Sequence, residues 1–68
     1  MTSQIADRVR LAIAAAGVDE ASVAQAADIS AADMNERLAG RVEFSVRELR
    51  GVGGFLRIPV TRFMEVAA

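Results

Sequence analysis

Residues 17–40 read GVDEASVAQAADISAADMNERLAG, and they are the most informative part of the chain about its fold. It predicts two short helices, over about residues 20–27 and 31–39, joined by residues 28–30. Three residues are too few for anything but a sharp turn between the two helices. Gly40 then ends the second helix, since glycine readily adopts the left-handed conformation found there. The stretch therefore predicts two helices that pack closely across a tight turn.

Three helix starts share one local pattern, which combines a capping residue with a pair of apolar residues around it. The caps are Asp19, Ser30 and Ser45, and the apolar pairs are Val18 with Val23, Ile29 with Met34, and Phe44 with Leu49. Each pair has the spacing of a hydrophobic staple. Asp33 and Glu48 follow the two serines by three residues, where a carboxylate reaches back to the cap amide as in a capping box. The repeated pattern indicates where these helices begin.

The rest of the chain also favours helices. An apolar stripe with spacings of three and four predicts a helix over about residues 4–16. Another helix begins after Ser45, and the glycines within residues 51–54 predict that it is weak and that a neighbouring backbone packs closely on it. Pro59 suits the first turn of a short last helix. We therefore predict an all-α, compact five-helix domain that occupies residues 1–68.

Composition excludes most catalytic chemistry. The chain has 68 residues, with no Cys and no His. A thiolate nucleophile, an imidazole base and the usual zinc ligands are therefore excluded. We predict that the protein is not an enzyme and that it has no metal site, no cofactor and no small-molecule substrate. No apolar run approaches the roughly 20 residues of a membrane helix, so we expect no membrane contact and a cytoplasmic location.

From Gly17 to Met64 the chain resembles the lambda-repressor/Cro-like family of DNA-binding domains, without needing a gap. Ala24 stands where the family has a nearly universal alanine, and Gly40 stands where a glycine closes its recognition helix. Residues 45–49, SVREL, are similar to the start of the family's fourth helix. The resemblance implies a lambda-repressor-like fold in which the second and third helices form a helix-turn-helix.

Three features depart from the family pattern. Asp28 stands where the family usually has glycine, and aspartate tolerates the left-handed conformation better than most residues. Ile13 and Leu38 stand where many members pair an arginine with a glutamate, so we expect an apolar contact there. Arg37 occupies a position that is commonly apolar, and it either extends outward or pairs with Asp33.

The resemblance places the helix over residues 31–39 in the major groove, with its first residues at the base edges. The side chains that it assigns to this face are Ser30, Ala31, Ala32, Asn35 and Glu36. Asn35 suits a bidentate contact with adenine, the alanine methyls suit a thymine methyl, and Glu36 suits a cytosine amino group. A solvated helix surface is the alternative for each of them. We assign Asp33 to the cap rather than to base reading.

Arginines just beyond this helix are the candidates for phosphate contacts. They are Arg41, Arg47 and Arg50. Arginine forms fork-shaped, charge-assisted pairs with phosphate, so a few such residues fix the register on DNA. The alternative is a surface of ion pairs, for which Glu43 and Arg47 have a helical spacing of four. A net charge of −1 predicts weak non-specific DNA binding.

We therefore predict a small bacterial or phage regulator of transcription, of the repressor or Cro-like type. It binds a double-stranded DNA operator, and we expect a dimer that reads two half-sites. Phe63, Met64 and Val66 are candidate contacts of a weak homodimer. Phe63 and Met64 suit the core of their own domain at least as well.

A protein-interaction module is the alternative function. In that case a helix-turn-helix fold has lost DNA binding and its acidic recognition helix binds a protein partner. Glu20, Asp33 and Glu36 favour this alternative, because they lie close to the expected DNA face and phosphates repel carboxylates.

Overall fold

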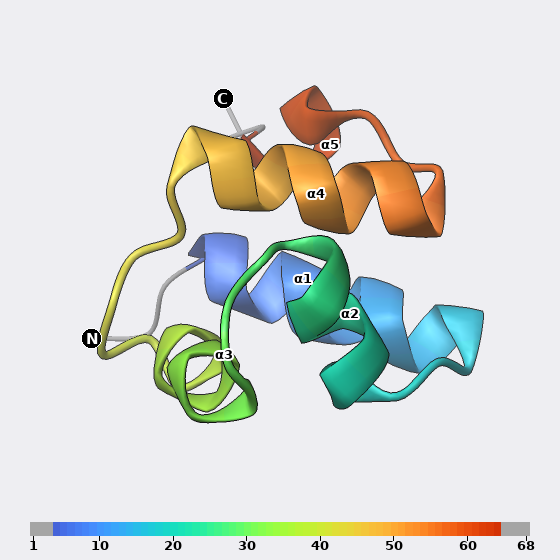
Figure 1. Cartoon of the computed structure of the whole chain (residues 1–68). Coiled ribbons are helices and arrows are strands. Elements are labelled where there is room, and N and C mark those ends of the chain that lie inside the picture. The colour runs from blue at the N-terminus through green and yellow to red at the C-terminus, as the bar shows by residue number, and fades with distance from the viewer. Residues whose placement is uncertain (1–3, 65–68) are drawn as a thin grey trace.

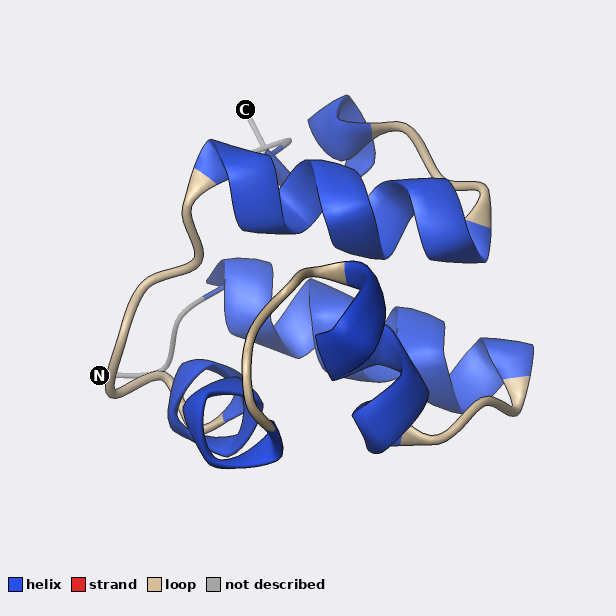
Figure 2. Ribbon diagram, in the orientation of Figure 1, coloured by secondary structure: helices blue, strands red, loops and turns tan. Residues whose placement is uncertain are grey.

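Five helices make up the computed structural model, which describes residues 4–64. They are α1 (Gln4–Ala16), α2 (Glu20–Ala26), α3 (Ala31–Leu38), α4 (Val46–Leu56) and α5 (Val60–Met64). No strand occurs within these residues (Figure 2), so the all-α prediction is confirmed. No helix in this part of the chain is long and apolar enough to cross a membrane. The predicted ranges are correct to within a residue at the ends of α2 and α3, where Ala27 and Ala39 are the C-terminal caps.

The helices form one body of about 32 × 25 × 21 Å. α4 runs alongside α1 and contacts α2 and α5 as well, while α3 contacts α1 and α2 (Figure 1). α2 and α3, which follow one another in the chain, thus lie against different parts of the α1–α4 pair. This arrangement leaves one long side of α3 at the surface.

Every helix contributes to a single apolar core. Its largest fully buried side chains are Val9, Val23, Met34, Leu49, Val52 and Phe63. Ile13 and Leu38 are 6% and 5% exposed and belong to the same core, in agreement with the predicted apolar replacement of an ion pair. Burial of each such side chain stabilises the fold by about 1.5–3 kcal/mol.

The helix starts differ in how their caps form. The apolar residues of the three staples pack as predicted, with Val23, Met34 and Leu49 buried. Asp19 is the N-cap residue of α2, as predicted, but its side chain makes no capping hydrogen bond to the helix backbone. It accepts a hydrogen bond from the Ser22 hydroxyl instead, at 3.1 Å.

Two glycines allow α4 to approach its neighbours closely. A Cβ atom on Gly51 would lie 2.5 Å from the carbonyl oxygen of Ala26 at the end of α2. A Cβ atom on Gly53 would collide with the carbonyl oxygen of Ile58, in the segment that leads into α5. The predicted close backbone contact is therefore confirmed at these two positions. Gly54 differs, since nothing lies within 4 Å of the place where its Cβ would be.

The turn between α2 and α3 is sharp because Asp28 adopts the left-handed conformation, with φ of 62°. This confirms the expectation from its place in the sequence. The amide of Ile29 donates to the carbonyl of Ala24 at 3.0 Å, which ties the turn to α2. Arg57 also has a positive φ, of 61°, and ends α4. No local pattern predicted this second left-handed residue.

Candidate nucleic-acid interface

One side of α3 is anchored in the core and the opposite side is exposed. Met34 and Leu38 are 0% and 5% exposed and hold the helix against the rest of the domain. The residues predicted to read DNA lie at the start and along the free surface of the helix, where Ser30, Ala31, Ala32 and Asn35 are exposed and Glu36 is half-buried. The structure thus brings these five residues together on one accessible surface. We call it the α3 face.

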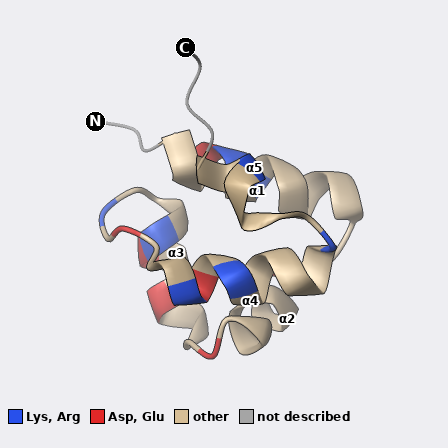
Figure 3. Ribbon diagram, turned by 90° about the horizontal axis from the view of Figure 1, so that it is seen from above, with Lys and Arg blue, Asp and Glu red and all other residues tan. Residues whose placement is uncertain are grey.

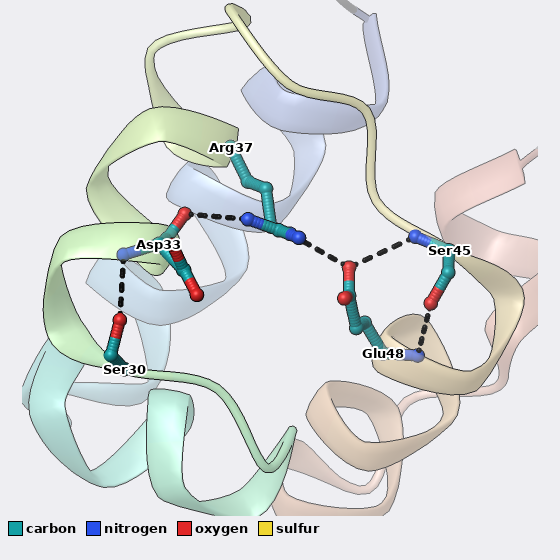
Figure 4. Close-up of polar contacts among 5 residues, drawn as sticks. All are labelled: Ser30, Asp33, Arg37, Ser45 and Glu48. Atoms are coloured by element: carbon teal, nitrogen blue, oxygen red, sulfur yellow. Dashed lines mark hydrogen bonds and ion pairs between the residues drawn. The ribbon is translucent and has the colours of Figure 1, made fainter.

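The first turn of α3 is capped by Ser30 alone. The Ser30 hydroxyl accepts a hydrogen bond from the backbone amide of Asp33, at 3.0 Å (Figure 4). The predicted return contact from the Asp33 carboxylate to the Ser30 amide is absent from the hydrogen bonds of the described residues. The side chain of aspartate is one methylene shorter than that of glutamate, the usual acid of a capping box. The Asp33 carboxylate therefore remains exposed on the surface.

The start of α4 has the complete arrangement that α3 lacks. The Ser45 hydroxyl accepts from the Glu48 amide at 3.1 Å, and the Ser45 amide donates to the Glu48 carboxylate at 3.0 Å. The same oxygen of Glu48 also accepts from Nε of Arg37 at 2.8 Å, so one carboxylate atom joins two helices (Figure 4). Arg37 further donates to the backbone carbonyl of Asp33 at 3.1 Å.

This arrangement gives Arg37 a structural role between two helices. Its side chain is 16% exposed, that of Glu48 is 14% exposed, and together they lie between α3 and the start of α4. Arg37 does not pair with the Asp33 carboxylate but with that of Glu48, which sequence reasoning did not identify. Arg37 therefore fixes α3 relative to α4.

The pair shifts the pKa of both groups. The hydrogen bond to Glu48 is the main reason that the pKa of Arg37 is raised, and the nearby charge of Asp33 adds to the effect. Burial raises the pKa of Glu48, but the hydrogen bonds from Arg37 and Ser45 together with the charge of Arg37 outweigh it. The pKa of Glu48 is therefore below its usual value, and the ionised pair stabilises the fold.

Arg41 and Arg47 lie near the two ends of the α3 face, and each meets a carboxylate. Nε of Arg41 is 2.6 Å from the Glu36 carboxylate, near the end of α3. Arg47 is 2.9 Å from the carboxylate of Asp28, in the turn before α3. The suggested pair of Glu43 and Arg47 is thus replaced by one with Asp28. Both arginines remain largely exposed: the exposed fraction of the side chain is 68% for Arg41 and 80% for Arg47.

The remaining arginines divide into paired and solvated groups. Arg50 is exposed, and none of the ion pairs within residues 4–64 involves it. Arg10 pairs with Asp7 on α1. Arg8 donates to the backbone carbonyl of Phe63 at 3.3 Å, which links α1 to α5. Arg50 is therefore the phosphate candidate with no competing carboxylate in the described part of the chain.

Acidic and basic residues are mixed around the α3 face. Residues 19–50 hold seven carboxylates and four arginines, whereas the rest of the chain holds two carboxylates and four arginines. Figure 3 shows the two charges side by side on α3 and on the first half of α4. Such mixing produces a surface with alternating charge rather than one uniformly basic stripe.

The residues predicted for a dimer contact do not share one environment. Phe63 is 2% exposed and belongs to the core of its own chain, so its aromatic ring is not available to a second copy. Met64 is 46% exposed at the end of α5. Val66 lies outside the described residues. Met64 is thus the member of this set that the structure places at the surface.

The described residues contain no group of three acidic side chains that is suited to hold a metal ion.

A scan against protein-family models, a search of curated proteins and a search of solved structures each found no match to this chain. The geometry and chemistry of the α3 face itself are therefore the basis for assigning a function.

Proposed function

We propose that the chain is a sequence-specific DNA-binding regulator of transcription, in which α2 and α3 form a helix-turn-helix and α3 enters the major groove of an operator. The observation that carries this proposal is the exposure of Ser30, Ala31, Ala32 and Asn35 at the start and along the free surface of α3, a helix that the core holds by its other residues. Recognition helices of this kind read base edges with their N-terminal residues.

The side chains of the α3 face suit close approach to bases. Two alanines leave the backbone of the first turn free to approach the floor of the groove, and their methyls suit a thymine methyl. Asn35 lies one turn further along with an amide that matches the donor and acceptor of adenine. This surface thus combines apolar and bidentate polar contacts within five residues.

Arginines near the ends of the helix suit the two flanking phosphate backbones. Arg41 lies beyond the end of α3, whereas Arg47 and Arg50 lie on α4, with Arg47 held next to the turn before α3. The ion pairs of Arg41 and Arg47 are exposed, and exposed pairs contribute only about 0–1 kcal/mol. Phosphates therefore compete with these carboxylates at little cost.

The charge around α3 favours one alternative, a protein-interaction module that binds a basic partner. Residues 19–50 have more carboxylates than arginines, and DNA-binding domains usually owe much of their affinity to phosphate neutralisation. On this alternative the exposed Asp33 and Glu20 contact the partner, and DNA is not bound.

Selection of bound duplexes from a random DNA pool at low salt separates these functions. An enriched inverted repeat with half-sites about one helical turn apart supports a dimeric operator-binding protein, and a single enriched half-site supports a monomer. No enrichment, together with no salt-sensitive retention of DNA, would overturn the proposal and favour the protein partner.

Substitutions then locate the surface on the selected duplex. Asn35→Ala should weaken binding by about 1–3 kcal/mol and relax selectivity at one base. Arg50→Ala should reduce the slope of log affinity against log salt by about 0.9, the contribution of one phosphate contact. Arg57→Ala, which removes the same charge from an exposed position at the end of α4, is the matched control and should leave the slope unchanged.

A further inference from the structure

We propose that the Asp33 carboxylate is a specificity-determining group that accepts a hydrogen bond from an exocyclic amino group in the major groove. It would select cytosine or adenine at one position of the operator and exclude guanine and thymine there. The inference rests on the proposed DNA binding by α3, and it assigns Asp33 a role different from the cap that its place in the sequence suggests.

The carboxylate is free because the cap of α3 uses only backbone and hydroxyl atoms of this turn. Ser30 accepts from the amide of Asp33 at 3.0 Å, and Arg37 donates to the carbonyl of Asp33 at 3.1 Å. Both contacts involve the backbone of Asp33 (Figure 4). Its carboxylate forms none of the hydrogen bonds or ion pairs found within residues 4–64, although it lies near enough to Arg37 for its charge to help raise the pKa of that arginine.

The other residues of the first turn offer little that would distinguish one base from another by hydrogen bonding. Ala31 and Ala32 end in methyl groups, and the Ser30 oxygen already accepts the amide of Asp33. Asp33 is exposed and adjoins Ala32, so its carboxylate is the strongest acceptor in the part of α3 expected to lie nearest the bases. The helix dipole favours a negative charge at this end of α3.

An ionised carboxylate accepts hydrogen bonds and donates none. In the major groove, cytosine N4 and adenine N6 present donors, whereas guanine N7 and O6 and thymine O4 present only acceptors at the same edge. Asp33 opposite guanine would bring two acceptors together without a proton between them. Every base pair carries one such donor, on its cytosine or its adenine, so the carboxylate reads which strand bears that base and disfavours guanine and thymine on the strand that it faces.

The test compares three proteins in the random-pool selection: the wild type, Asp33→Asn and Glu43→Gln. Asparagine has nearly the same shape as aspartate but donates as well as accepts, so it tolerates guanine. Glu43 is exposed in the loop before α4, and its substitution removes the same single charge without touching α3. Thermal unfolding verifies the fold of Asp33→Asn, whose cap is unaffected because the cap uses the backbone amide of residue 33.

We expect the wild type to deplete guanine and thymine at one position by about tenfold, and Asp33→Asn to lose the depletion of guanine there. Glu43→Gln should increase the overall retention of DNA but keep the same base preference. The inference is overturned if Asp33→Asn keeps the wild-type preference at every position, or if Glu43→Gln changes the same position. A wild type that selects no sequence overturns the proposed function together with the inference, so the two failures are distinguishable.

Discussion

At the start of α3 Ser30 is followed by Asp33, and at the start of α4 Ser45 is followed by Glu48, three positions on in both helices. Both serines accept a hydrogen bond from the backbone amide of the acid. Only the longer glutamate returns a contact to the serine amide, at 3.0 Å, and only it meets Arg37. One methylene thus separates a carboxylate that holds the fold together from one that remains at the surface.

The two helix starts show how a small domain divides its polar groups between stability and surface exposure. The carboxylate at the start of α4 is largely buried and is used twice: it accepts from the Ser45 amide in the capping box and from Arg37 in the link to α3. The start of α3 keeps its carboxylate and its small side chains exposed. The fold therefore depends on one of the two starts and leaves the other available for a ligand.

Removal of the Glu48 side chain should have the largest effect on the stability of the fold. Glu48→Ala removes half of the capping box and leaves Arg37, 16% exposed, without its carboxylate, so it should lower the free energy of unfolding by about 2–3 kcal/mol. Asp33→Ala is the matched control and should cost less than about 1 kcal/mol. Urea unfolding followed by circular dichroism measures both values. Equal losses of stability in the two variants would contradict the different roles assigned to Glu48 and Asp33.

Lowering the pH should have an intermediate effect on the stability of the fold. Because Glu48 has a lower pKa in the folded state than in the unfolded state, its ionised form stabilises the fold. This contribution is complete at pH values above its unfolded pKa of about 4.3 and is lost as the pH falls through its lower, folded pKa. Thermal unfolding between neutral and strongly acidic pH should thus show a loss of stability that is smaller in Glu48→Gln. The same pH dependence in both proteins would show that Glu48 is not responsible.

The smallest effect should come from converting the start of α3 into that of α4. Asp33→Glu supplies the missing methylene, so its carboxylate should reach the Ser30 amide and raise the free energy of unfolding by about 0.5 kcal/mol. The exchange of the Ser30 amide with deuterated water should slow as well. If stability and exchange are unchanged, side-chain length is not what separates the two starts.

Much of this fold follows from local sequence patterns. Staples and caps predict the starts of α3 and α4, and Asp28 adopts the predicted left-handed turn because its short polar side chain tolerates it. Gly51 and Gly53 mark the predicted close backbone contacts. These features depend on a few neighbouring residues, which is why the sequence predicts them.

What the sequence could not predict depends on how the helices are oriented in space. Arg37 and Glu48 are eleven positions apart and meet only because α3 and the start of α4 come together. The pairing of Arg47 with Asp28 has the same origin, at a separation of nineteen positions. Asp33 could not be distinguished from Glu48 by pattern, because the geometry of each start decides whether the carboxylate reaches the amide.

The most direct test of the account is a titration of isotope-labelled protein with its selected duplex, in which the amide resonance of each residue is followed. We predict the largest shifts at residues 30–36 and at Arg41, Arg47 and Arg50, with little change at Leu11 and Ala14 on the exposed side of α1. Shifts that avoid residues 30–36, or that gather on α1 instead, would contradict the claim that the α3 face binds DNA.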